Sequence, residues 1–157
     1  MGLHYLGGYN CEADQRFWGI YQERNVKKQT PDHSRAEFLL KESENAYDVL
    51  IQLIDKMGVE DKTANLFVKS CYDIVMELIR ARMLLDGLNA SGKGAHEAEV
   101  SYTRKFGFKE TDVQFLDKLR YYRNGTVYYG KILDMEYAQK VIEFTKKNYK
   151  RLKESVK

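Results

Sequence analysis

The sequence predicts an all-α protein, an up-and-down helical bundle of about five main helices, and three observations support this fold class. The 157 residues are enough for one domain and too few for two of ordinary size. Pro31 is the only proline, where average usage of about 5% would give about eight. Apolar residues recur at alternating steps of three and four, which places them on one helix face. We expect residues 31–157 to form the bundle and residues 1–30 to be an N-terminal extension, of which 12–28 are compatible with one helix.

The first two predicted helices form a pair. Thr30 and Pro31 suit the N-cap and the first helical position, and Gly58 ends the first helix. Its periodic face consists of Ala36, Leu40, Ser43, Tyr47, Leu50, Ile54 and Met57. The second helix ends at Gly87 and repeats the spacing at Ala64, Phe67, Cys71, Ile74, Leu78, Ala81 and Leu85. Because the connection between them is short, the two helices are expected to be antiparallel neighbours.

A loop and two more helices are readily recognised further along the chain. Residues 89–94 are rich in Gly, Asn and Ser and are predicted to form a loop, and residues 95–106 are predicted to form a short helix that ends at Gly107. Asp134 is expected to cap the last helix, whose periodic residues are Met135, Ala138, Ile142, Thr145, Tyr149 and Leu152.

The remaining segment carries two conflicting signals. A helix that begins at Thr111 or Asp112 would place Phe115, Leu119 and Tyr122 on one face. Asn124-Gly125, however, lies among Tyr, Thr and Val residues, which is the strongest short-range signal for a β-hairpin. We predict a helix as far as about Tyr122 and leave helix and hairpin open beyond it.

Charge is distributed unevenly along the chain, although the net charge is only +3. Residues 32–62 hold four basic and eight acidic residues, a net charge of −4, whereas residues 101–131 hold seven basic and three acidic residues, a net charge of +4. Residues 132–157 add seven basic and four acidic residues, a net charge of +3. A basic C-terminal half is compatible with solvated helix faces and also with binding of an anionic ligand or RNA.

Several chemistries are disfavoured by the motifs that are incomplete. The stretch Gly87–Gly94 approaches a phosphate-binding P-loop, but Gly94 stands where the magnesium-binding hydroxyl is required. The two cysteines, Cys11 and Cys71, form no CxxC pair or Cys/His cluster, so neither a metal nor a cofactor is expected. No run of 18 apolar residues and no export signal is visible, and we therefore expect a cytoplasmic protein without membrane association.

One segment carries a more specific pattern. Its sequence is Leu116-Asp117-Lys118-Leu119-Arg120-Tyr121-Tyr122-Arg123-Asn124-Gly125-Thr126-Val127-Tyr128-Tyr129-Gly130. Together with the stretch from Tyr72 to Gly87 and that from Ser91 to Ser101, it resembles the HEPN family (higher eukaryotes and prokaryotes nucleotide-binding domain) over about residues 30–155. The family signature is Arg, usually Asn, three variable residues and His. Arg123-Asn124 matches its first half, and Tyr128 stands at the histidine position, as in a prokaryotic branch of the family.

The resemblance implies a helical homodimer that binds RNA or a nucleotide in a cleft. Many HEPN proteins are metal-independent ribonucleases, often the toxin of a pair whose antitoxin is a small nucleotidyltransferase. By this resemblance Arg123 would contact phosphate, with Tyr128 in the catalytic position and Asn124, Arg120 and Tyr129 in the binding set. Weak or lost ribonuclease activity is expected, because tyrosine has an ordinary pKa near 10 and is a poor base at neutral pH.

Each of these residues also has a structural interpretation. Arg123 could simply pair with a carboxylate, and Glu77 on the second helix is the candidate to orient it. His96 could supply the missing imidazole, or could be a polar residue near a helix start. In a regular helix Tyr128 would lie about 140° around the axis from Arg123, so one shared cleft requires the helix to end or distort between them. The tyrosines around Arg123 could stack on bases or pack in the core. The alternative function is a non-catalytic interaction module that binds a nucleotidyltransferase.

Overall fold

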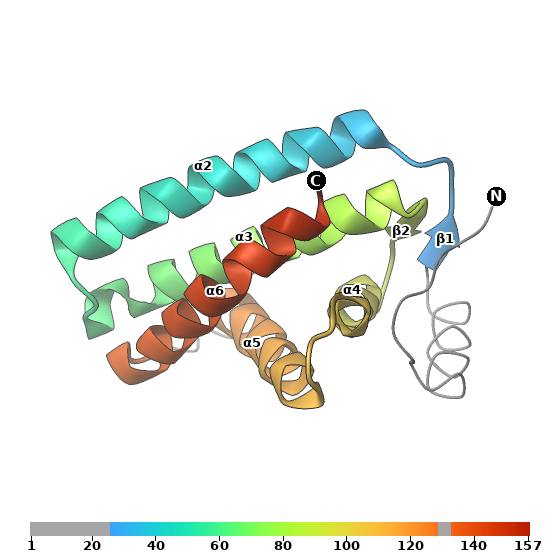
Figure 1. Ribbon diagram of the computed structural model, residues 1–157. Helices are drawn as coiled ribbons and strands as arrows, with labels where there is room; N and C mark the ends of the chain where they lie inside the picture. The colour runs from blue at the N-terminus through green and yellow to red at the C-terminus, as the bar shows by residue number, and fades with distance from the viewer. Residues whose placement is uncertain (1–25, 129–132) are drawn as a thin grey trace.

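The structure, a computed structural model, describes residues 26–128 and 133–157, with residues 125–128 described by their backbone alone. This part of the chain is mostly helical, which confirms the predicted class, and it also contains one small sheet (Figure 1). In chain order its elements are β1 (Val26–Lys28), α2 (His33–Met57), α3 (Asp61–Leu85), β2 (Leu88–Ala90), α4 (Ala95–Tyr102), the 3-10 helix η1 (Thr103–Phe106), α5 (Glu110–Tyr128) and α6 (Met135–Ser155).

Helices α2 and α3 form the predicted antiparallel pair, each 25 residues long. Gly58 ends α2 with φ of 74°, and Glu60 and Thr63 form a capping box that starts α3. The predicted start of α2 is two residues early. Asp32 rather than Thr30 is the N-cap, because its Oδ1 accepts a hydrogen bond from the Arg35 amide at 2.9 Å.

Helix α3 is the centre of the fold. It packs against α2, α4, α5 and α6, and its buried residues come from several sides of the helix rather than from one stripe. Its largest fully buried side chains are Phe67, Ile74, Met76, Leu78, Ile79 and Met83. The free thiol of Cys71 is also in this core, and burial raises its pKa to about 11.

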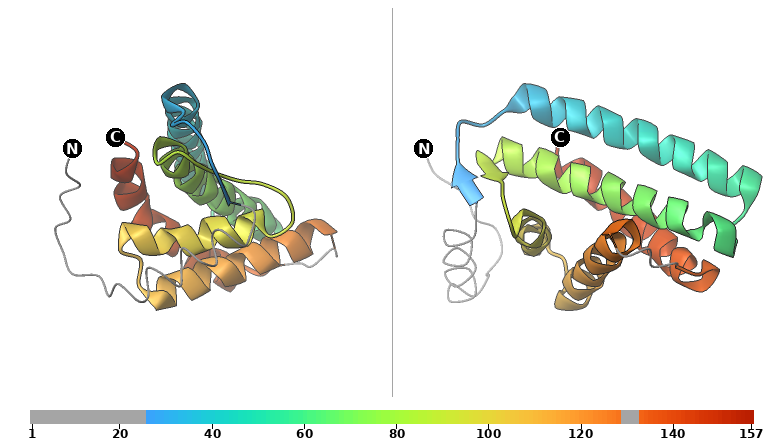
Figure 2. Two further views of the ribbon diagram at one scale, coloured as in Figure 1. Left: turned by 90° about the vertical axis from the view of Figure 1, so that its right-hand side faces the viewer. Right: turned by 180° about the vertical axis from the view of Figure 1, so that it is seen from behind.

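Helix α6 is aligned with α3 by polar contacts at both of its ends. Near its start, the Leu133 amide donates to Asn65 Oδ1 at 2.9 Å and the Met135 amide donates to Asp61 Oδ1 at 2.8 Å. Near its end, Arg82 Nη1 donates to the Ser155 carbonyl at 2.9 Å. Helix α6 therefore runs parallel to α3, while α4 and α5 lie across the other helices (Figure 2). The up-and-down prediction holds for α2 and α3 and not for α6, since the chain crosses back through α4 and α5 between α3 and α6.

The small sheet is absent from the sequence-based prediction. Strand β1 pairs antiparallel with β2, with Val26 opposite Ala90 and Lys28 opposite Leu88. Residues 26–28 are thus a strand rather than the end of a helix over 12–28, whose other residues lie outside the described part of the chain. Residues 89 and 90, predicted as loop, also belong to a strand. Each strand has three residues, and the pairing joins segments about sixty positions apart, so no local pattern reveals it.

Helix α5 continues to Tyr128, and the β-hairpin alternative for residues 119–133 is therefore wrong. It starts at Glu110, one residue before the predicted start. Leu116 and Leu119 are fully buried against the core. A two-stranded hairpin is marginal unless it packs on other structure, whereas this helix is supported by the burial of its apolar face.

The tight connection after α3 generates a testable prediction. Gly87 has φ of 69°, and a Cβ added there would lie 2.6 Å from the backbone carbonyl of Gln29. We expect Gly87→Ala to lower the free energy of unfolding by about 2–4 kcal/mol, because a left-handed conformation alone costs about 1–2 kcal/mol and the clash adds to it.

Gly94→Ala is the matched control, since Gly94 has φ of 89° and nothing within 4 Å of the added Cβ. Urea denaturation of the two variants separates the clash from the conformational cost. Equal losses in the two proteins would show that the Gln29 contact does not constrain the connection.

Candidate functional site

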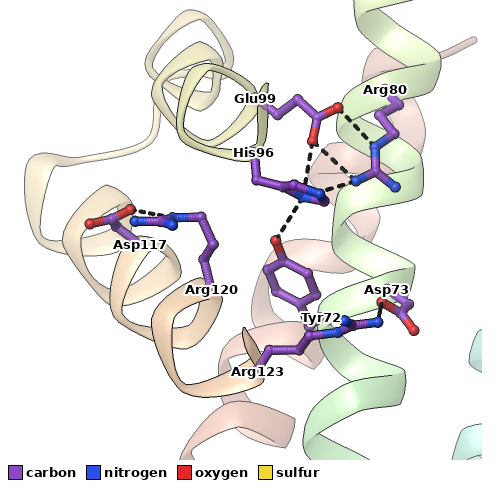
Figure 3. Close-up of polar contacts among 8 residues, drawn as sticks. All are labelled: Tyr72, Asp73, Arg80, His96, Glu99, Asp117, Arg120 and Arg123. Atoms are coloured by element: carbon purple, nitrogen blue, oxygen red, sulfur yellow. Dashed lines mark hydrogen bonds and ion pairs between the residues drawn. The ribbon is translucent and has the colours of Figure 1, made fainter. Parts of the chain in front are cut away.

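Arg123 contacts Tyr72 of α3, Arg80 contacts His96 of α4, and Arg120 lies beside them with its guanidinium turned toward Asp117 (Figure 3). Arg80 comes from α3, and Arg120 and Arg123 come from α5. Residues three apart on a helix share a face, which is why Arg120 and Arg123 can both approach Tyr72. The three guanidinium groups differ in how well their N–H donors are satisfied, and this difference separates structural from functional roles.

Arg80 is held by a bidentate ion pair with Glu99 of α4. Its Nε donates to Oε1 at 2.9 Å and its Nη2 donates to Oε2 at 3.1 Å. Only 6% of the Glu99 side chain is exposed. A buried carboxylate left without its cation would be strongly destabilising, so this pair fixes α4 against α3.

His96 completes the same network. Its Nδ1 lies 3.2 Å from Arg80 Nη2 and 3.2 Å from Tyr72 Oη. Because an arginine can only donate, Nδ1 is the acceptor and the neutral ring carries its proton on Nε2. Burial lowers the pKa of His96 below its ordinary value, and the charges of Arg80, Arg123 and Arg120 lower it further against the opposing effect of Glu99. His96 is therefore neutral at pH 7.

Arg123 is the least satisfied of the three arginines. Its Nη2 lies 3.6 Å from Asp73 Oδ1, which is too long for a hydrogen bond, and its guanidinium carbon lies 5.9 Å from the centre of the Tyr72 ring. Its Nε is buried and has no hydrogen-bond partner among the described residues. The side chain is 28% exposed, so an incoming ligand can reach it.

Arg120 lies between these extremes. Its Nε donates to Asp117 Oδ1 at 2.8 Å within α5, and its Nη2 forms a longer ion pair of 3.6 Å with Glu97 of α4. The charge of Arg120 lowers the pKa of His96 and opposes the burial that raises the pKa of Tyr72 to about 12. Arg120 therefore belongs to the same electrostatic site as Arg123.

The structure gives Arg123 a different carboxylate partner from the predicted one. Its ion pair is with Asp73, one helical turn before Glu77. Glu77 Oε2 is buried without a hydrogen-bond partner in the described chain, and burial, together with the charges of Asp73 and Glu42, raises its pKa. Neither Glu77 nor Asp117 touches Arg123 in the contacts that the structure shows.

The structure separates Arg123 from position 128, the last position of the Arg-Asn-x3-Tyr pattern. Helix α5 passes without interruption from Arg123 to Tyr128, so the two positions lie about 140° apart around the helix axis. The distortion at Gly125 that would bring both to one face is absent. Asn124 follows Arg123 on α5 and is partly buried. The side chain of Tyr128 and the whole of Tyr129 lie outside the described residues.

The site thus contains Arg123, Arg120 and His96 from the predicted set, and it adds Tyr72, Asp73, Arg80 and Glu99. The sequence signal for the Arg80–Glu99 ion pair was weak, because an arginine on an amphipathic helix and a glutamate on a short helix are usually solvated. The spacing of His96 and Glu99, three residues apart on one helix face, was the available clue.

Within the described residues, we find neither a cluster of metal-ligating side chains nor a helix that could span a membrane. No group of three or more His, Cys, Asp or Glu side chains in this part of the chain could hold a metal ion. None of its helices combines the length and the apolar character needed to cross a membrane.

No protein-family model matches the chain, and no curated protein matches it either.

The electrostatic coupling of Arg123 to His96 can be measured. We expect Arg123→Gln to raise the pKa of His96, since the positive charge of Arg123 disfavours the imidazolium. An NMR titration of the His96 ring protons reports this pKa directly. Arg35→Gln, a change at an exposed arginine at the start of α2, is the control and should leave the titration unchanged.

The lowered pKa of His96, which is due mainly to burial, fixes the sign of a pH effect on stability. Because folding favours neutral His96, its contribution to stability is complete above its ordinary pKa of 6.5 and decreases as the pH falls below that value.

Identical His96 titration curves for wild type and Arg123→Gln would contradict the described position of Arg123.

Proposed function

We propose that the protein is an HEPN-like RNA-binding protein that holds a phosphodiester group at Arg123. One observation carries this proposal, namely the partly exposed guanidinium of Arg123, which has a buried Nε without a partner among the described residues and only a long contact to Asp73. A guanidinium presents two parallel N–H donors that match the oxygens of a phosphate, and it stays charged at every physiological pH.

The neighbouring residues favour ligand binding at Arg123 over binding at Arg80. Arg80 already donates two hydrogen bonds to a buried carboxylate, and releasing them would leave Glu99 unpaired. The carboxylate beside Arg123 belongs to Asp73, whose side chain is 53% exposed and can turn toward water. An exposed ion pair of this length contributes little, so phosphate can replace it at low cost.

The chemistry around Arg123 supports binding more than turnover. RNA cleavage needs a base for the 2′-hydroxyl, and the Nδ1 of His96 is occupied by Arg80 and Tyr72. Burial raises the pKa of Tyr72 to about 12, which makes its phenol a poor base at pH 7. His96 is therefore better suited to positioning Tyr72 and Arg80 than to accepting a proton.

The binding prediction is tested with a short single-stranded RNA at low salt by fluorescence anisotropy. We expect Arg123→Ala to weaken binding about 10- to 100-fold, since a charge-assisted hydrogen bond is worth about 1.5–3 kcal/mol. Asp73→Asn should tighten binding, because it removes the carboxylate that competes with phosphate.

Arg35→Ala is the matched control, since it removes one exposed positive charge from α2, on the far side of α3 from this site. Equal losses of RNA affinity in Arg123→Ala and Arg35→Ala would show that the effect comes from net charge and not from a contact at Arg123. Failure of the wild type to bind any RNA or nucleotide at low salt would overturn the proposed function.

Catalysis is tested separately by incubating RNA with the protein in EDTA. We expect the wild type to cleave slowly or not at all and Tyr128→His to remain inactive as well, because position 128 lies about 140° around α5 from Arg123. Cleavage by the wild type that is lost in Arg123→Ala would instead identify a metal-independent ribonuclease.

A second candidate function, an interaction module that pairs with another copy or with a nucleotidyltransferase, rests on a separate surface. Phe38 and Val49 are 62% and 55% exposed on α2. They lie eleven residues apart, about three turns, so they share one face of the helix. The two side chains are about 16 Å apart and form no contiguous patch, but a partner that packs along this face of α2 would cover both. If the double variant Phe38→Ser/Val49→Ser sediments as a smaller species than the wild type, this face mediates association.

A further inference from the structure

A groove of about 750 Å³ runs between α4 and α5 beside the arginine site. Its lining residues include Val100 and Ser101 of α4 and Gln114, Asp117, Arg120 and Tyr121 of α5. Gln114 and Tyr121 are seven residues apart, so this side of the groove follows two turns of α5, about 10 Å. A volume of this size is ample for a nucleoside.

Arg120 connects the groove to the site around Arg123. It lines the groove, and its charge also acts on His96 and Tyr72. Arg123 follows Arg120 by three residues, on the same side of α5. An RNA strand with one phosphate at Arg123 can therefore pass Arg120 and place the base of a neighbouring nucleotide in the groove.

Tyr121 is the most exposed of the large hydrophobic side chains in the described chain, at 65%. Its ring meets the ring of Tyr122 edge to face at a centroid distance of 5.8 Å, and Tyr122 meets Tyr137 in the same way at 5.1 Å. Tyr121 thus contacts one further ring, that of Tyr122, which itself packs on Tyr137, while most of the Tyr121 surface faces solvent. An aromatic ring that is supported on one side and open on the other is a platform on which a base can stack.

The polar lining of the groove fits a base rather than a second phosphate. Carboxylates of Glu97, Glu110 and Asp117 alternate with cations of Arg104, Lys118 and Arg120, so the charges balance. The amide of Gln114 and the hydroxyl of Ser101 both donate and accept hydrogen bonds, as the edge of a base requires.

We propose that the groove between α4 and α5 is a base-binding subsite, in which one unpaired base of an RNA strand stacks on Tyr121 while the phosphate of a neighbouring nucleotide contacts Arg123. This proposal rests on the proposed function and extends it from phosphate binding to single-stranded RNA with at least one unstacked base. Double-stranded RNA, whose bases are paired and stacked, is excluded from such a subsite.

The test compares two RNA strands that have the same phosphates and differ only in their bases. One is a short strand that carries 2-aminopurine, a base whose fluorescence falls when it stacks, and the other is the same strand with an abasic ribose at that position. For the wild type we expect quenching of 2-aminopurine on binding. We expect Tyr121→Ala to abolish the quenching and to weaken binding of the intact strand about 5- to 100-fold, the range of one base–aromatic stack. Binding of the abasic strand should be unchanged.

Two variants control for the loss of a ring and of apolar surface. Tyr121→Phe keeps the ring and should preserve quenching and affinity. Leu66→Ala removes an exposed apolar side chain of 48% exposure on α3, outside the groove, and should change neither. The Tyr121 side chain is mainly solvated, so we expect all three variants to fold, which circular dichroism verifies.

The outcomes distinguish this proposal from the one on which it rests. If Tyr121→Ala binds the intact strand as the wild type does while Arg123→Ala loses binding, the base subsite is overturned and phosphate binding stands. An equal loss for intact and abasic strands in Tyr121→Ala would also overturn the subsite. If the wild type binds neither strand at low salt, the proposed function itself fails.

Discussion

The burial of α3 among four other helices is the constraint on which the rest of the structure depends. A helix covered on several sides has few positions left for polar side chains, and each of them needs a partner from a neighbouring element. Four polar side chains of α3 have such partners. Asp61, Asn65 and Arg82 fix the ends of α6, while Arg80 fixes α4 through Glu99. The arrangement of the outer helices is therefore set by the few polar groups that interrupt one apolar helix.

The candidate site uses the same residue type in two opposite ways. Arg80 donates to the carboxylate of Glu99 and to the imidazole of His96, which also contacts the Tyr72 phenol, and it acts as part of the scaffold. Arg123 reaches the same phenol from the other side and finds only an exposed carboxylate at a long distance. Under the proposed function, the rigid cation would fix the geometry in which the unsatisfied one contacts phosphate. Residue type alone does not distinguish the two roles; the burial of the partner carboxylate does.

The sequence predicted the helices well because their signals are local. Gly58, Gly87 and Gly107 end helices where expected, and Asp134 caps α6 by accepting from the Tyr137 amide at 2.8 Å. The strand pair was missed because its two segments of three residues are far apart in the chain. The site was predicted in part. Arg123, Arg120 and His96 were predicted as site residues, and the structure brings them together. Glu77 was predicted as the carboxylate beside Arg123, whereas the structure has Asp73 there. Those two carboxylates lie four residues apart on α3. The position at which α5 crosses α3 decides which of them meets Arg123, and helical periodicity in the sequence does not predict that position.

The order in which contacts can form along the chain has a consequence for how the site is built. The loop between α2 and α3 is only three residues long, so this pair closes with little loss of chain entropy and is suited to nucleate folding. The contacts of the site span larger separations, 19 residues for Arg80 with Glu99 and 50 for Arg123 with Asp73. Closing them requires α4 and then α5 to dock on a pair that already exists. We therefore expect the arginine site to form late in folding, so that substitutions there accelerate unfolding while the rate of folding stays close to that of the wild type.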